Sequence, residues 1–199
     1  MEDFVTDDPV ARELRRTELA KRLMSHEVRT KTITDLSGLS RNRQETLRRR
    51  LGVPDEDRRR GSARHSLKVF LADPAEKTEG AALAGLCIIF NIAIGPYEAI
   101  APEGLDTLGL GERLCEIYEA YGGCFPGTEL KFEELMLLRS RLSKGDAMEL
   151  GKCRRCRCLI LVNRLKPSQR ICQHCAPQRV GEASPNSESE TGSTVSDDT

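Results

Sequence analysis

The chain has 199 residues, of which 38% are hydrophobic and 31% are charged, and its formal net charge is zero. This composition is typical of a soluble globular protein with one or two domains. No apolar run approaches the ~20 residues of a membrane-spanning helix, and the acidic start of the chain lacks the basic and apolar order of a signal peptide. We therefore predict a cytoplasmic protein with no membrane segment, in a compartment where disulfides are rare.

Residues 1–60 are predicted to form an N-terminal helical region. Val10, Leu14, Leu19 and Leu23 recur near three- and four-residue spacing, which favours an amphipathic helix. An arginine-rich stretch, residues 57–62, is the expected linker to the next region.

Residues 32–52 have the pattern of a helix-turn-helix segment. Gly38 permits the left-handed turn that closes a first short helix, and Ser40 is a favourable N-cap for a second. Leu47 and Leu51 are expected to hold the second helix against the core. Its other faces would present side chains of the kind that read purine edges or bind phosphates in the major groove: Arg41, Asn42, Arg43, Gln44, Arg48 and Arg49. The alternative interpretation is an ordinary solvated pair of amphipathic helices.

Residues 61–150 are predicted to be a helical middle region. Apolar residues at helical spacing lie between 83 and 90 and again between 110 and 121. Cys87, Cys115 and Cys124 lie in or beside these patterns and are expected to be small core residues.

The spacing of four other cysteines predicts a metal site in a small module, residues 151–178. Cys153 and Cys156 form one Cys-x2-Cys pair, and Cys172 and Cys175 form a second pair after fifteen intervening residues. This spacing is typical of a structural zinc ribbon or treble-clef-like module, because each tight knuckle aims two sulfurs at one ion about 2.3 Å away. Residues 159–162 are expected to form a strand, followed by a hairpin turn over residues 163–167. We predict one Zn²⁺ ion per chain.

Several alternatives to this zinc site stay open at this point. The thiols could be reduced and buried without a metal, iron could take the place of zinc, and Cys158 could compete with Cys156 as a ligand. A catalytic zinc is disfavoured, because a closed four-thiolate site leaves no open position for water. Four thiolates around Zn²⁺ carry a net charge of about −2, which the nearby arginines would partly balance.

Charge is unevenly distributed over the last third of the chain. Residues 152–179 contain no acidic residue, and the basic side chains of this stretch are candidates for phosphate contacts: Arg154, Arg155, Arg157, Arg164, Lys166 and Arg170. Residues 179–199 form an acidic tail without a hydrophobic pattern, which we predict to be disordered. This tail could shield the basic module and compete with DNA.

These features favour a sequence-specific DNA-binding regulator that acts by binding and not by catalysis. A zinc-dependent protein-interaction adaptor without DNA contact is the alternative suggested by the acidic tail and the helical middle. An enzyme is disfavoured, because the sequence contains only three histidines and no credible nucleophile–base or paired-carboxylate arrangement. A zinc-ribbon RNA binder is disfavoured by the scarcity of aromatic residues that would stack on bases.

The order of these parts resembles the FlhC family, the flagellar master activator subunits and their relatives on mobile elements. The resemblance rests on the Gly-Leu-Ser-Arg sequence of residues 38–41, the Leu-Met-Leu-Leu-Arg sequence of residues 135–139 and the cysteine quartet. It covers roughly residues 10–177. The chain differs from the flagellar members in lacking tryptophan and in its acidic tail, so control of other operons fits equally well.

The resemblance implies a mainly helical fold with a four-cysteine zinc site. It also implies a transcriptional activator that binds double-stranded DNA upstream of promoters and contacts RNA polymerase. The expected partner is a small helical FlhD-like protein, with which the chain would form a hetero-oligomer.

Overall fold

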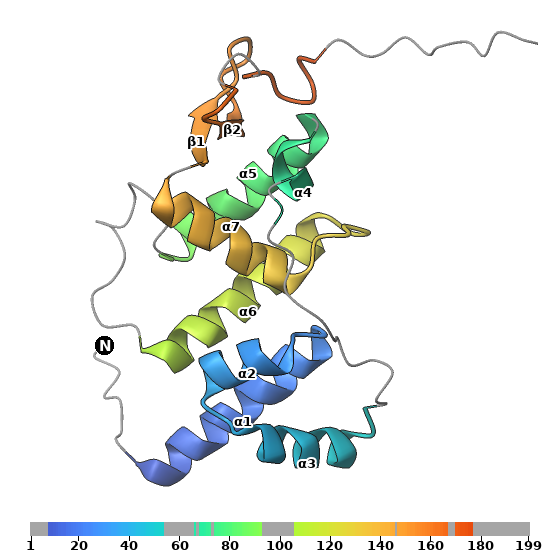
Figure 1. Cartoon of the computed structure of the whole chain (residues 1–199), viewed down its shortest axis with the longest axis vertical. Coiled ribbons are helices and arrows are strands. Elements are labelled where there is room, and N and C mark those ends of the chain that lie inside the picture. Colours follow the sequence, from blue (N-terminus) through green and yellow to red (C-terminus); the bar gives the residue numbers. More distant parts are fainter. Residues whose placement is uncertain are drawn as a thin grey trace, which may run out of the picture.

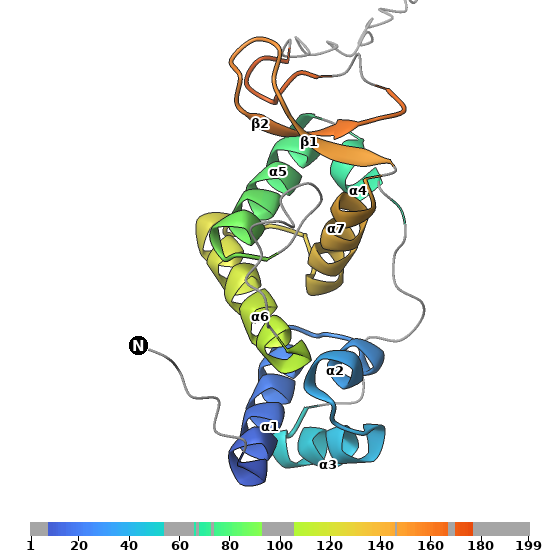
Figure 2. The ribbon, with the colours of Figure 1, turned by 90° about the vertical axis from the view of Figure 1, so that its left-hand side faces the viewer.

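The computed structural model describes residues 8–53, 66, 68–72, 74–92, 106–145, 147–166 and 170–176. Over these ranges the chain is mainly helical, as predicted, with seven helices and one two-stranded antiparallel sheet. The body is elongated, with α1, α2 and α3 at one end and the sheet at the other (Figure 1 and Figure 2). The predicted linker at 57–62 and the predicted disordered tail at 179–199 lie outside the described residues.

The first helix, α1 (Pro9–Ser25), begins at the N-cap Asp8, whose carboxylate accepts hydrogen bonds from the amides of the first turn. The predicted helix is present, but its four apolar residues do not share one face: Leu19 and Leu23 are buried, whereas Val10 and Leu14 are 67% and 62% exposed. Nine residues separate each exposed residue from a buried one. At 3.6 residues per turn, this spacing places them on opposite sides of the helix.

The predicted helix pair is present as α2 (Thr30–Ser37) and α3 (Arg41–Leu51). Gly38 ends α2 with φ +72°, and its amide donates to the carbonyl oxygen of Thr34, which confirms the predicted left-handed turn. Leu39 is buried and anchors the turn to the core. Ser40 occupies the N-cap position of α3, but its side chain makes no capping hydrogen bond.

The middle region comprises α4 (Lys68–Leu71), α5 (Pro74–Ile89), α6 (Thr107–Cys124) and α7 (Phe132–Lys144). The long helix α6 packs against α1 and α2 near one end of the body and against α5 further along. Gly111 permits the contact with α1, because a Cβ atom there would lie 2.7 Å from Cδ2 of Leu19. None of the helices in the described ranges combines the length and apolar character that a membrane span requires.

Ion pairs follow the same contact between α1 and α6. Arg15 lies 2.6 Å from Glu112, and Arg22 lies 2.5 Å from Glu119. The hydrogen bond from Arg22 lowers the pKa of the Glu119 carboxyl below its ordinary value of 4.5. All four side chains are partly exposed, so these pairs fix the register of the two helices more than they stabilise the fold.

Two of the three predicted core cysteines are buried. Burial raises the pKa of Cys87 and of Cys115 to about 12. Cys124 is exposed, so its assignment to the core is wrong. It is the last residue of α6 and follows two exposed glycines, Gly122 and Gly123.

Candidate metal centre and basic surfaces

The cysteine module is built on a hairpin of β1 (Met148–Lys152) and β2 (Leu159–Asn163). The strand predicted at 159–162 is confirmed, but its partner is the preceding strand and not one after a turn at 163–167. Lys152 pairs with Leu159, so the connection between the strands is residues 153–158, here called the first knuckle. Asn163 does begin a turn, since its side-chain oxygen accepts the amide of Leu165 at 2.9 Å.

The two faces of β2 serve different neighbours. Alternate residues of a strand point to opposite faces. Leu161 joins the main helical core, whereas Ile160 and Val162 pack with Cys153 and Cys172 in a separate small cluster. The hairpin therefore lies between the helical body and the cysteines, and it positions the first knuckle relative to α5.

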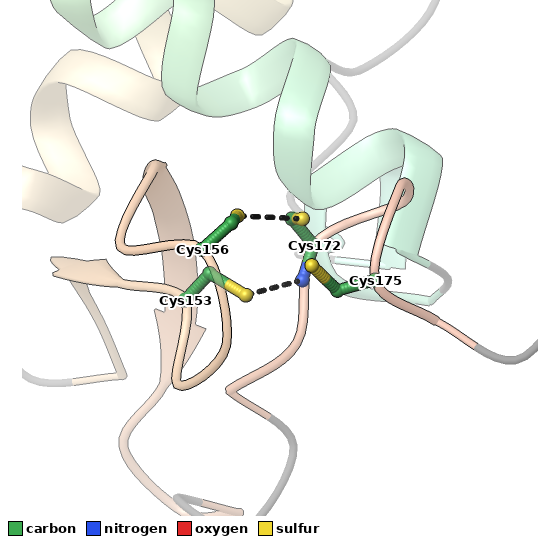
Figure 3. A group of neighbouring side chains, drawn as sticks. All are labelled: Cys153, Cys156, Cys172 and Cys175. Carbon is green, nitrogen blue, oxygen red and sulfur yellow. Dashed lines mark hydrogen bonds between the residues drawn. The ribbon is translucent and has the colours of Figure 1, made fainter.

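The structure brings the four predicted ligands together. The sulfurs of Cys153, Cys156, Cys172 and Cys175 all lie within 4.8 Å of one another. Figure 3 shows them converging from two loops, the first knuckle and residues 172–175, here called the second knuckle. A tetrahedral ion with bonds of about 2.3 Å requires sulfurs roughly 3.8 Å apart, so the quartet can hold one metal ion. Cys158 is exposed and is not a member of this quartet.

Backbone hydrogen bonds give the knuckles their shape. The amide of Arg157 donates to the carbonyl oxygen of Cys153 at 3.0 Å, and the amide of Cys175 donates to that of Cys172 at 3.1 Å. The two knuckles are also joined directly. The amide of Cys172 donates to Sγ of Cys153 at 3.4 Å, and the guanidinium of Arg155 donates to the carbonyl oxygen of Cys175 at 2.9 Å.

The thiols of the quartet differ in how readily they ionise. Backbone amides of the two knuckles lower the pKa of Cys153 to about 5. Hydrogen bonding with Cys156 and desolvation raise the pKa of Cys175 to about 12. Four thiolates this close repel one another, and a bound dication removes that repulsion and deprotonates its ligands. The donor set and its electrostatics therefore fit a bound metal ion.

Several predicted phosphate contacts of the module are already engaged within the protein. Arg170 forms an ion pair of 2.8 Å with Glu149 of β1, and Arg164 donates to the carbonyl oxygen of Gly145 and lies 3.8 Å from Glu149. Sequence reasoning missed Glu149, because it precedes the acid-free stretch and reaches these arginines only through the hairpin.

The side chains predicted to form the DNA-reading face of α3 divide into two groups. Arg41, Asn42, Arg43 and Arg49 are exposed. Gln44 and Arg48 are buried, with 0% and 6% of their surface exposed. The prediction that these two side chains face solvent and contact DNA is therefore wrong.

One helical turn separates the buried pair on α3, and they share the face packed toward the neighbouring helices. Gln44 donates to Oγ1 of Thr34 at 2.8 Å and to the carbonyl oxygen of Leu39 at 2.9 Å. It therefore braces the turn between α2 and α3. Leu51, expected to anchor this helix, is instead substantially exposed.

An ion pair from α1 restrains part of the exposed face. Arg43 pairs with Glu13 of α1, and Arg41 lies 3.9 Å from Glu45 one turn along α3.

No protein-family model matches this chain, and no curated protein matches it by sequence. The resemblance to the FlhC family stays a prediction that rests on the residues quoted above.

The two basic surfaces lie at opposite ends of the body. Helix α3 is at the end formed by α1–α3, and the knuckles are at the end formed by the hairpin (Figure 2). Helix α6, whose 18 residues span about 27 Å, runs between these ends. The arginines of α3 and those of the module therefore do not form one continuous face.

Proposed function

We propose that this chain is a DNA-binding transcription regulator whose α2–α3 unit enters the major groove. The observation that carries the proposal is the shape of that unit: a left-handed turn at Gly38, a bracing glutamine beneath it, and a second helix with exposed polar residues at its N-terminal end. The N-terminal residues of a recognition helix are the ones that reach base edges. The protein acts by binding, and we propose no catalytic step.

The exposed residues of α3 divide by position. Arg41 and Asn42 lie at the start of the helix and extend from its outer face, where they would contact bases. Arg49 and Arg50 lie in its last turn and would contact phosphates. Arg43 reaches DNA only if it leaves Glu13, so its contribution is smaller.

The cysteine quartet would hold one Zn²⁺ ion with a structural role. Zinc is the ion that four thiolates in tetrahedral arrangement favour, and iron is the alternative for the same ligands. A bound ion would stabilise the fold of a module whose own apolar cluster consists of few residues. Metal analysis of the purified chain distinguishes the two ions, because four-thiolate iron is coloured and zinc is not.

The further parts of the proposal follow the resemblance to the FlhC family. They are an activator role in the cytoplasm, assembly with a small helical FlhD-like partner, and contact with RNA polymerase at promoters. The support for them is the sequence order of the α2–α3 unit and the cysteine quartet.

The test is selection of bound genomic fragments by the chain, with and without the product of a neighbouring gene, followed by electrophoretic mobility shift. Arg41→Ala should weaken binding to a selected site by about 1–3 kcal/mol and relax its sequence preference. Arg49→Ala should weaken all sequences alike and reduce the salt slope by about one. Lys144→Ala, an exposed cation of α7, is the matched control.

Equal effects of the α3 variants and the control would contradict the assignment of α3 as the recognition helix. The second candidate, a protein-interaction adaptor, is favoured by the outward-facing apolar pair on α1, Val10 and Leu14. A chain that binds no DNA at low salt, but retains a partner after nuclease treatment, would support the adaptor.

A further inference from the structure

Two arginines of the first knuckle lack the contacts that engage the other arginines of the module. Arg155, Arg164 and Arg170 are engaged by a carbonyl oxygen or by Glu149. Arg154 and Arg157 are exposed, and neither side chain has an ion-pair partner within the part of the chain that the structure describes. These two residues are here called the knuckle tip.

The backbone at Arg157 points to a role for its side chain. Its φ is +68°, in the left-handed region that costs free energy for any residue with a Cβ atom. Glycine would adopt this conformation without that cost. An exposed arginine at a position where glycine would be more stable indicates that its charge is used.

The module as a whole has a surplus of positive charge. Its described residues, 147–166 and 170–176, include seven basic residues and one acidic residue, Glu149. A bound zinc ion with four thiolates removes about two of these charges. Four positive charges are left over, so the exposed knuckle tip attracts anions.

The chain carries a segment whose negative charge is about as large as the positive surplus of the module. Residues 182–198 contain five acidic residues and no basic one: Glu182, Glu188, Glu190, Asp197 and Asp198. The chain that leads to this segment leaves the described body just after Ala176. That point is beside the first knuckle, because Arg155 is hydrogen-bonded to Cys175. Six residues from Ala176 to Glu182 span up to about 20 Å, which is enough to bring the acids to the tip.

We infer that the knuckle tip, Arg154 and Arg157, is an anion-binding surface whose occupant is the acidic segment 182–198 of the same chain. Tethering gives the segment an effective concentration in the millimolar range, so it is favoured over a polyanion in solution. Any external polyanion must displace the segment to reach the tip. This inference does not depend on DNA binding by α3.

The experiment uses the full zinc-loaded chain, labelled with ¹⁵N, and compares amide shifts of residues 182–198 with those of a synthetic peptide of the same segment. At about 0.1 M salt the shifts should differ from the peptide. At about 1 M salt they should converge on it, because the screening length falls from ~10 Å to ~3 Å. In Arg154→Ser/Arg157→Gly they should match the peptide at both salt concentrations.

Two controls are needed. The first tests whether the knuckle still folds and binds zinc when Arg157 is replaced, and the second tests whether arginines elsewhere on the body also affect the tail. Arg157→Gly alone should keep one zinc per chain, since glycine suits that backbone. Arg49→Ser/Arg50→Ser on α3 removes two exposed arginines at the other end of the body and should leave the tail shifts unchanged.

Three outcomes would overturn the inference: tail shifts equal to the peptide in the native chain, tail shifts that persist in the knuckle variant, or loss of the shifts in the α3 variant alone. Added duplex DNA could also change the amide shifts of residues 154–157 without changing those of the tail. That result would overturn the inference and would identify nucleic acid as the occupant of the knuckle tip.

Discussion

Replacing Gly80 with alanine should loosen the attachment of the cysteine module to the helical body. Gly80 lies on α5 where β2 crosses it, and a Cβ atom there would overlap Cδ1 of Leu161 and lie 3.2 Å from Cδ1 of Phe70. Both neighbours are fully buried, so neither has free space into which to move. Leu161 must change its rotamer within the packed core or move together with β2, and a shift of β2 would also displace Ile160 and Val162 from the cysteines.

The size of the effect follows from two opposing contributions. Alanine in the interior of a helix is favoured over glycine by about 1 kcal/mol. Overfilling a packed contact costs typically about 1–3 kcal/mol. Gly85→Ala in the same helix is the matched control, because a Cβ atom there meets nothing within 4 Å. The difference between the two variants removes the helix-propensity contribution and should be about 1–3 kcal/mol.

Urea unfolding of the metal-loaded chain measures this difference, and transfer of the metal to a colorimetric chelator reports on the module. Gly85→Ala should raise the urea midpoint and leave the transfer rate unchanged. Gly80→Ala should have a lower midpoint than Gly85→Ala and transfer its metal faster. If the two variants have the same midpoint and the same transfer rate, the close packing of β2 on α5 is wrong.

Three further predictions concern the thiols and the contact between α1 and α6. Cys156→Ser should lose tightly bound metal, whereas Cys158→Ser should keep one ion per chain. Metal analysis after dialysis measures the ions that each variant retains. The reverse result would show that Cys158, and not Cys156, is the ligand. In the metal-loaded chain, iodoacetamide should modify Cys158 but not Cys87, because Cys158 is exposed and the side chain of Cys87 is fully buried; peptide mass spectrometry detects either, and rapid labelling of Cys87 would contradict its burial. The pKa of Glu119 is lowered by Arg22, so its stabilisation is complete above the ordinary carboxyl pKa of about 4.5 and is lost as pH falls through the lower folded value. Glu119→Gln should therefore lose less stability than the native chain on acidification, by up to about 1 kcal/mol for such partly exposed groups, and equal acid sensitivity would rule this pair out as the cause.

The sequence predicted the parts of this fold that depend on local chemistry. The cysteine spacing located the quartet because each knuckle is a local turn, and Gly38 located the turn between α2 and α3 because few residues tolerate its backbone conformation. The spacing did not show that Val10 and Leu14 lie away from the core, because a five-residue step separates Leu14 from Leu19. That step rotates the helix by 500°, and it moved the apolar side from one face to the opposite one.

Other features depend on contacts between distant segments and could not be predicted. Gln44 has the same chemistry as a base-reading residue, and only the position of the preceding turn shows that its amide is used within the protein. The partner of β2 was assigned to the wrong side because a strand pattern does not specify which neighbour it pairs with. The ion pair of Glu149 with Arg170 arises only after that pairing.

The position of the hairpin explains why the module needs two kinds of attachment. Ile160 and Val162 face a small cluster that contains two of the cysteines, and this cluster is separate from the main core. Leu161, between them, belongs to the main core. A bound metal ion would therefore stabilise the outer face of β2, while the contact with Gly80 stabilises its inner face. Loss of a bound metal would free the knuckles directly, but it would reach α3 only through the intervening helices: α5 and α6, and α7, which contacts β1 and whose Glu133 accepts the amide of Arg29 at the start of α2.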